Sequence, residues 1–157
     1  MVKMDDIDKD ILNILQQNDK ISYKEIGQKL NMAPSSIHNR VKNMEKSGLI
    51  KSFSAIVDPF KAGLNTVAVL GLSVDVQRLK DVAQILKSYD EVQTVAVTTG
   101  GHDMIAQVIA RDEKELWRFI NKKVKTIEGV RSQMDVSSFI DTCKMTHFIN
   151  FKSEKLT

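Results

Sequence analysis

Small polar side chains and cations gather between residues 31 and 50, in the stretch NMAPSSIHNRVKNMEKSGLI. Ile37, Val41 and Met44 recur there at helical spacing, which predicts a helix with one buried face. The other face carries donors and acceptors that suit base edges in a DNA major groove, since Asn pairs with adenine and Lys bonds guanine or phosphate. We expect Arg40, at the edge of the buried face, to contact a phosphate. The predicted DNA-contacting residues are Ser35, Ser36, His38, Asn39, Arg40, Lys42 and Asn43.

The start of this helix is unusual. Pro34 suits the first helical position, but the preceding Ala33 has no side-chain oxygen to cap the helix. We therefore expect the backbone amides of Ser35, Ser36 and Ile37 to remain open to a DNA phosphate.

Two further helices must position the polar face. The segment DDIDKDILNILQQN, residues 5–18, has helical amphipathic spacing. Ser22 and Glu25 form a capping-box pattern that starts a second helix, and Gly48 ends the third. A helix, a tight turn and a helix make the helix-turn-helix layout, whose second helix enters the major groove. The alternative is a three-helix unit that is merely polar outside and serves as a helical adaptor contacting protein.

The remainder of the chain has a different hydrophobic periodicity. Alternating and β-branched residues predict strands at 66–75, 92–99, 104–110 and 130–141, with helices at 78–89 and 112–127. This βαββαβ order predicts a ferredoxin-like domain. A further strand is expected at 49–58. The predicted class is α+β, with a winged-type helix-turn-helix domain at 1–52, a β-strand linker at 53–65 and the ferredoxin-like domain at 66–157.

The predicted sheet is apolar on both faces. Apolar residues occupy both odd and even positions of two predicted strands, although the two helices can cover only one face of the sheet. They are Val67, Ala68, Val69, Leu70 and Leu72 in the first strand and Met104, Ile105, Ala106, Val108 and Ile109 in the third. An identical sheet from another protomer would cover the second face, so we expect a homodimer or a larger assembly such as a tetramer or octamer.

The chain resembles the Lrp/AsnC family of transcription regulators from about Met4 to Cys143. The matching positions are Asp8, Ile11, Leu12, Ile26, Pro34, Arg40, Val41, Gly48, Leu49, Ile50, Ala55, Asp58 and Pro59. The resemblance implies a regulator that binds a palindromic double-stranded DNA operator and a small-molecule effector. The chain departs from the family pattern in two ways: Ala33 replaces a Ser, and Gln133 and Asp135 replace a Thr-x-Thr pair.

The resemblance also implies an amino-acid effector site between dimers. Gly100 and Asp103 fit the family's Gly-x-x-Asp pattern, and the carboxylate of Asp103 could pair with an α-amino group. If Asp135 faces the same pocket, two carboxylates would favour a basic ligand; the alternative is a solvated strand residue. The implied effector-binding residues are Thr98, Thr99, Gly100, Gly101, His102, Asp103, Gln133 and Asp135.

Composition narrows the remaining possibilities. The net charge of the 157 residues is +3, yet residues 33–52 alone hold four cations against one acid. We expect a cytoplasmic protein, because the N-terminus lacks an apolar signal segment and no apolar run could span a membrane. The single Cys143 with His147 is too small a set for a metal site. No catalytic constellation, metal or cofactor is expected; the alternative function is a ferredoxin-like small-molecule-binding or enzymatic domain with a helical adaptor.

Overall fold

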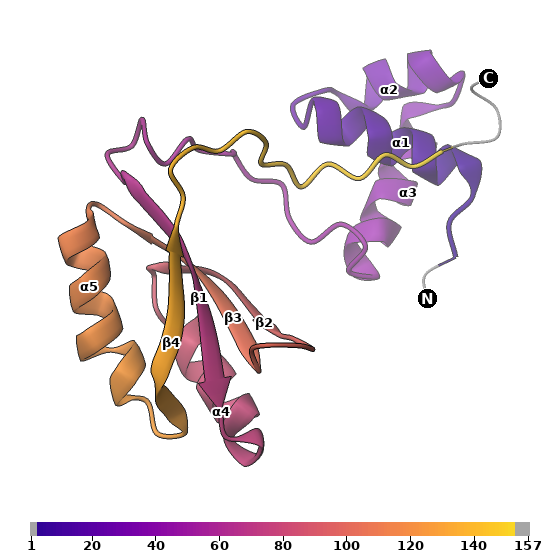
Figure 1. The fold of residues 1–157 in the computed structure, drawn as a ribbon. Coiled ribbons are helices and arrows are strands. Elements are labelled where there is room, and N and C mark those ends of the chain that lie inside the picture. Colours follow the sequence, from indigo (N-terminus) through magenta and orange to yellow (C-terminus); the bar gives the residue numbers. More distant parts are fainter. Residues whose placement is uncertain (1–2, 153–157) are drawn as a thin grey trace. The chain divides into compact units, whose positions relative to one another are not determined.

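The computed structural model describes residues 3–152 and divides into two units (Figure 1). One unit holds residues 3–55 together with 144–152, and the other holds residues 56–143. Each unit has its own hydrophobic core. Within the described residues, no helix is both long and apolar enough to cross a membrane.

The helical unit is built from α1 (Asp6–Gln17), α2 (Tyr23–Leu30) and α3 (Pro34–Lys46). Both α1 and α2 start with a capping box, centred on Asp5 and Ser22 respectively, so their first amides are satisfied locally. The apolar stripes of the three helices meet in one core, as their spacing predicts. The most buried members of that core are Ile11, Ile26, Ile37 and Val41.

The second unit is a four-stranded antiparallel sheet with two helices, in the predicted βαββαβ order. Its strand order β2-β3-β1-β4 is that of a ferredoxin-like fold. Even-numbered residues of β1 and β3 face the core beside α4 and α5, and they are fully or almost fully buried. The elements are β1 (Thr66–Val74), η1 (Val76–Arg78), α4 (Leu79–Lys87), β2 (Val92–Val97), β3 (Met104–Ala110), α5 (Glu113–Lys122), η2 (Val124–Thr126) and β4 (Val130–Ser138).

The strand predicted at 49–58, and with it the β-strand character of the 53–65 linker, is wrong for this chain. Residues 51–58 are exposed and form no strand or helix. Alternating β-branched residues favour an extended backbone, but a strand also needs a neighbour that pairs with its amides and carbonyls. The described sheet uses only the four strands of the second unit.

The C-terminal segment also differs from the prediction, which placed all of 66–157 in the ferredoxin-like domain. Residues 144–152 belong to the helical unit instead. The reason is side-chain chemistry on α1: Asn13 and Gln16 hydrogen-bond the backbone of Phe151 and Ile149.

Candidate nucleic-acid interface and effector turn

The outer face of α3 carries six of the predicted contact residues, unpaired. Ile37, Val41 and Met44 are buried against α1 and α2, which turns the opposite side of the helix to solvent. Within residues 3–152, these six side chains form no intramolecular hydrogen bond or ion pair, so their donors and acceptors are available to a partner. They are Ser35, Ser36, His38, Asn39, Lys42 and Asn43, of which Ser36 is half-buried and the others are exposed.

The turn before α3 depends on a close backbone contact. Asn31 ends α2 in the left-handed conformation, with φ 53°. Gly27 faces the following chain so closely that a Cβ there would lie 2.5 Å from the carbonyl oxygen of Met32. Only glycine fits without a shift of the backbone, a requirement that the periodicity of the sequence did not reveal.

The start of α3 is partly as predicted. Ala33 supplies no side-chain cap, but its carbonyl accepts hydrogen bonds from the amides of both Ser36 and Ile37, at 3.0 and 3.3 Å. The expectation of three open amides is therefore wrong for these two. Within the described residues the Ser35 amide has no acceptor, so it is the one left for an outside oxygen.

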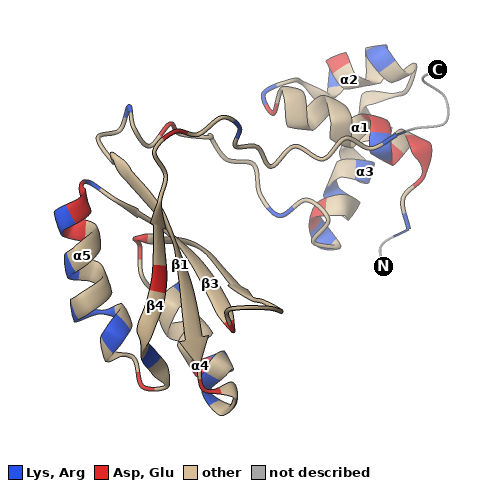
Figure 2. Ribbon diagram, viewed as in Figure 1, with Lys and Arg blue, Asp and Glu red and all other residues tan. Residues whose placement is uncertain are grey.

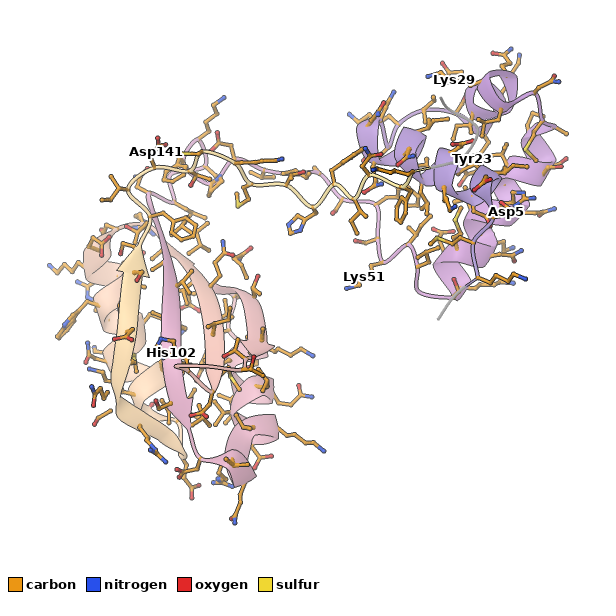
Figure 3. The ribbon with its side chains drawn as sticks, turned by 45° about the vertical axis from the view of Figure 1, so that its right-hand side comes forward. Asp5, Tyr23, Lys29, Lys51, His102 and Asp141 are labelled. Atoms are coloured by element: carbon orange, nitrogen blue, oxygen red, sulfur yellow. The ribbon has the colours of Figure 1, made fainter. Side chains whose placement is uncertain are left out.

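Tyr23 contacts the exposed face of α3, and the sequence analysis did not identify it. Its ring lies 5.5 Å from the ring of His38, centroid to centroid, in a tilted arrangement. Tyr23 also packs against the core of the helical unit (labelled in Figure 3). The His38 ring is thus held from one side while it stays exposed to solvent.

Arg40, which we expected to contact a phosphate, has partners inside the helical unit. Its Nη1 lies 2.8 Å from Asp5 Oδ2 and 2.7 Å from Asp8 Oδ1, which ties α3 to the start of α1. The Asp8 backbone amide, and then Arg40, lower the pKa of the Asp5 carboxyl; the two carboxylates raise the pKa of Arg40. Figure 2 shows the acids gathered at the start of α1 and cations along α3.

The predicted effector turn between β2 and β3 is held together by its own polar groups. Asp103 Oδ2 accepts a hydrogen bond from the Val74 amide at 2.9 Å, and the Asp103 amide donates to the Leu72 carbonyl at 3.0 Å. Thr98 Oγ1 donates to the His102 carbonyl at 2.7 Å. The Asp103 carboxylate is therefore engaged by the fold itself, next to the irregular register of β1 and β4.

Asp135 lies close to this turn, as the second carboxylate hypothesis requires. Its Oδ2 is 3.2 Å from His102 Nε2. The His102 ring lies over Gly71 of β1, where a Cβ would come within 2.5 Å of the ring (Figure 3). Thr99, Gly100 and Gly101 are exposed at the tip, and Gln133 is exposed on β4.

Comparison with known proteins agrees with the division of the chain into a helical unit and a sheet unit. Residues 4–51 match a family model described as winged helix-turn-helix DNA-binding, and residues 67–146 match the Lrp/AsnC ligand binding domain. An uncharacterised HTH-type transcriptional regulator of Pyrococcus horikoshii is 37% identical over 131 residues, covering 83% of each chain. The HTH-type transcriptional regulator Ptr1 of Methanocaldococcus jannaschii is 32% identical over 145 residues, 90% of this chain and 98% of the relative.

Solved structures share the fold. AsnC of E. coli superposes with a TM-score of 0.86 at 24% identity, covering 94% of this chain and 99% of the other. A Neisseria meningitidis regulator solved in complex with L-Met has a TM-score of 0.84 at 23% identity, covering 92% and 95%. From both domain matches and the identities of the archaeal regulators, the chain belongs to the Lrp/AsnC family: it is a transcriptional regulator with a helix-turn-helix DNA-binding domain and a ligand-binding domain.

Proposed function

We propose that the regulator reads a palindromic operator with the outer face of α3. The observation that carries this proposal is the set of six polar side chains on α3 that the fold leaves unused, on a helix whose other face is buried. Lys42 contacts phosphate or guanine, and Asn39 and Asn43 contact base edges. In place of the phosphate contact predicted for Arg40, we assign that residue the role of holding α3 against α1.

The uncapped start of α3 adds a backbone contact to the proposal. The Ser35 amide lies at the positive end of the helix dipole, and no side chain of Ala33 covers it. A DNA phosphate is the natural acceptor at such a position. Replacing Ala33 by Ser should raise stability and weaken DNA binding; equal or higher affinity would show that this amide is not used.

The proposal includes a homodimer, and a larger assembly such as a tetramer or octamer. The odd-numbered residues of β1 and β3 lie on the sheet face opposite the helices, where the apolar side chains of Val69, Ile105 and Ile109 are only half-buried. A second copy of the sheet would cover this face. Paired α3 helices one DNA turn apart would read half-sites about 10 base pairs apart. A monomer in gel filtration at micromolar concentration would defeat this part.

For the effector we propose an amino acid or a related metabolite that binds at the Thr98–Asp103 turn. Support comes from the ligand-binding domain match and from the structurally similar regulator solved with L-Met. Because Asp103 accepts a hydrogen bond from the Val74 amide and Asp135 Oδ2 lies 3.2 Å from His102 Nε2, each carboxylate already has a polar neighbour in the fold, and we propose no preference for basic ligands. Thermal shift measurements with the twenty amino acids test the proposal; a complete absence of response would contradict it.

One experiment tests DNA recognition directly. The full chain, which we place in the cytoplasm with the genome, is used to select fragments of genomic DNA, with and without added amino acids. Recovery of fragments sharing a palindrome with half-sites about one turn apart is the expected result. Fragments without a common sequence would contradict specific recognition. Binding should also weaken steeply as salt rises, because phosphate contacts release counterions.

A further inference from the structure

The C-terminal segment of the described chain lies along α1 like a bound peptide (Figure 1). Asn13 Nδ2 donates to the Phe151 carbonyl at 2.7 Å, and the Phe151 amide donates to Asn13 Oδ1 at 3.0 Å. Gln16 repeats this pattern with Ile149, at 2.9 Å and 2.8 Å. Two side-chain amides therefore satisfy both backbone groups of two residues that lie more than 130 positions away in the sequence.

This pattern is how one strand recognises another. In an antiparallel ladder, a hydrogen-bonded pair of residues exchanges both backbone bonds, and alternate residues of a strand point the same backbone edge to the partner. Ile149 and Phe151 are such alternate residues, and the intervening Asn150 is exposed. Asn13 and Gln16 are three positions apart on α1 and so lie on the same side of the helix. They substitute for the neighbouring strand.

One apolar side chain adds to the polar contacts. Phe151 packs against the core of the helical unit and is only partly exposed, whereas the Ile149 side chain is 61% exposed. The recognition is therefore mostly of backbone, with one apolar anchor. A ligand for this surface must be an extended segment with two free amides at alternate positions and a large apolar residue at the second.

We propose that this face of α1 is a peptide-binding site whose ligand is the chain's own segment Ile149–Phe151. The segment follows β4 and Cys143 of the ligand-binding unit, so its docking gives the DNA-binding unit a second connection in addition to the linker before β1. Two connections allow fewer arrangements than one. The docked segment thereby lowers the entropy cost of placing paired α3 helices on two half-sites.

Amide hydrogen exchange of the full chain tests the docking itself, independently of DNA. The double variant Asn13→Ala/Gln16→Ala should exchange the amides of Ile149 and Phe151 at least about tenfold faster than the parent, because their acceptors are gone. Gln17→Ala is the matched control, since Gln17 is exposed on the same helix and should leave both rates unchanged. Unchanged rates in the double variant would overturn the proposal.

A change in the segment gives a second test that leaves α1 intact. Ile149→Pro removes the amide that donates to Gln16 and should release Phe151 as well, seen as faster exchange of its amide. Asn150→Pro is the matched control, because the Asn150 amide makes no hydrogen bond within the described residues. Retained protection of Phe151 in Ile149→Pro would show that the backbone is not what α1 recognises.

The consequence for DNA rests on the proposed function and is measured separately. The double variant should bind a two-half-site DNA about tenfold more weakly than the parent, and a single half-site equally well. An equal loss on both DNAs, or no loss on either, would overturn the role as a second connection. If the parent binds neither DNA, the proposed operator reading fails, while hydrogen exchange still decides the docking.

Discussion

The two polar sites of this regulator use their side chains in opposite ways. On α3, the fold leaves six polar side chains without an intramolecular partner while apolar residues hold the helix from behind. At the Thr98–Asp103 turn, polar groups hydrogen-bond within the fold: Asp103 accepts from the Val74 amide, and Thr98 donates to the turn's own backbone. His102 Nε2 lies 3.2 Å from Asp135 Oδ2. The polar side chains of α3 are thus available to a binding partner, whereas much of the hydrogen-bonding capacity of the turn stabilises the turn itself.

This difference predicts what substitutions do. A polar group with no partner in the fold can be removed at little cost to folding, because no buried donor or acceptor is left behind. A polar group that satisfies a backbone amide cannot. Substitutions on the outer face of α3, the proposed DNA contact, should therefore change binding without changing stability, whereas substitutions in the Thr98–Asp103 turn, the proposed effector site, should change both.

The largest expected effect is at a glycine behind α3. Gly27→Ala would place a Cβ 2.5 Å from the Met32 carbonyl oxygen, which can be relieved only by a shift of the backbone, and should destabilise the helical unit by about 3 kcal/mol. DNA affinity should fall with it, since the turn sets the position of α3. Denaturant unfolding measures the loss. Gly101→Ala at the effector turn is the control, because a Cβ there meets nothing within 4 Å; similar losses in both would contradict the argument.

The second largest effect is expected from removing the Asp103 carboxylate in the Thr98–Asp103 turn. Asp103→Ala leaves the Val74 amide without its acceptor and should lower the free energy of unfolding by about 2 kcal/mol. Asn43→Ala on α3 is the matched polar deletion and should stay within about 0.5 kcal/mol of the parent. The same unfolding measurement decides both. Equal stability of the two variants would remove the distinction between the sites.

A third pair of substitutions distinguishes the roles of two cations on α3. Lys42→Ala should leave stability unchanged and reduce the slope of log affinity against log salt by about 1. Arg40→Ala should leave that slope unchanged but lower stability by about 1 kcal/mol, because it removes the contacts to Asp5 and Asp8. Titration of operator DNA at several salt concentrations distinguishes them. A reduced slope for Arg40→Ala would restore the phosphate contact predicted from sequence.

The smallest expected effect depends on pH. The pKa of Asp5 is lowered below its ordinary 3.8 by the Asp8 amide and by Arg40, so ionised Asp5 stabilises the folded state. Its contribution is complete above that ordinary value and is lost as the pH falls through the lower folded pKa. Because the site is half-exposed, we expect less than about 1 kcal/mol.

Thermal unfolding of the parent and Asp5→Asn, from about pH 5 downward, tests this. Asn also caps helices well, so the two proteins differ mainly in charge. The pKa of Glu25 is also lowered, by the hydroxyl and amide of Ser22, but Glu25 is present in both proteins and contributes equally to their pH dependence. The stability difference between the two proteins should shrink as the pH falls; a constant difference would show that the charge of Asp5 contributes nothing.

Sequence patterns foresaw most of the local structure. The apolar stripes of α1, α2 and α3, the capping box at Ser22 and the Pro34 start of α3 all follow from neighbours within one helical turn. The βαββαβ order also followed, because strand and helix spacing differ in period. Both predictions were of element type, which is local information.

The linker strand shows where local information ends. The segment at 49–58 has the composition of a strand, and the structure holds it without strand pairing. Composition favours an extended backbone, but pairing depends on a neighbour that can lie anywhere in the chain or outside it. A pattern within ten residues contains no such information.

Sequence alone determined the helices, the order of helices and strands along the chain, and the polar face of α3, since each depends on residues a few positions apart. Tertiary structure alone decided that Arg40 meets Asp8, that His102 meets Asp135, and that Phe151 docks on Asn13. These contacts join residues about 30 to 140 positions apart. They close long loops of the chain, and the residue pattern within a single helix or strand does not predict which distant residues will meet. They determine which of the described polar residues already have partners within the fold and which remain available for the proposed DNA contacts.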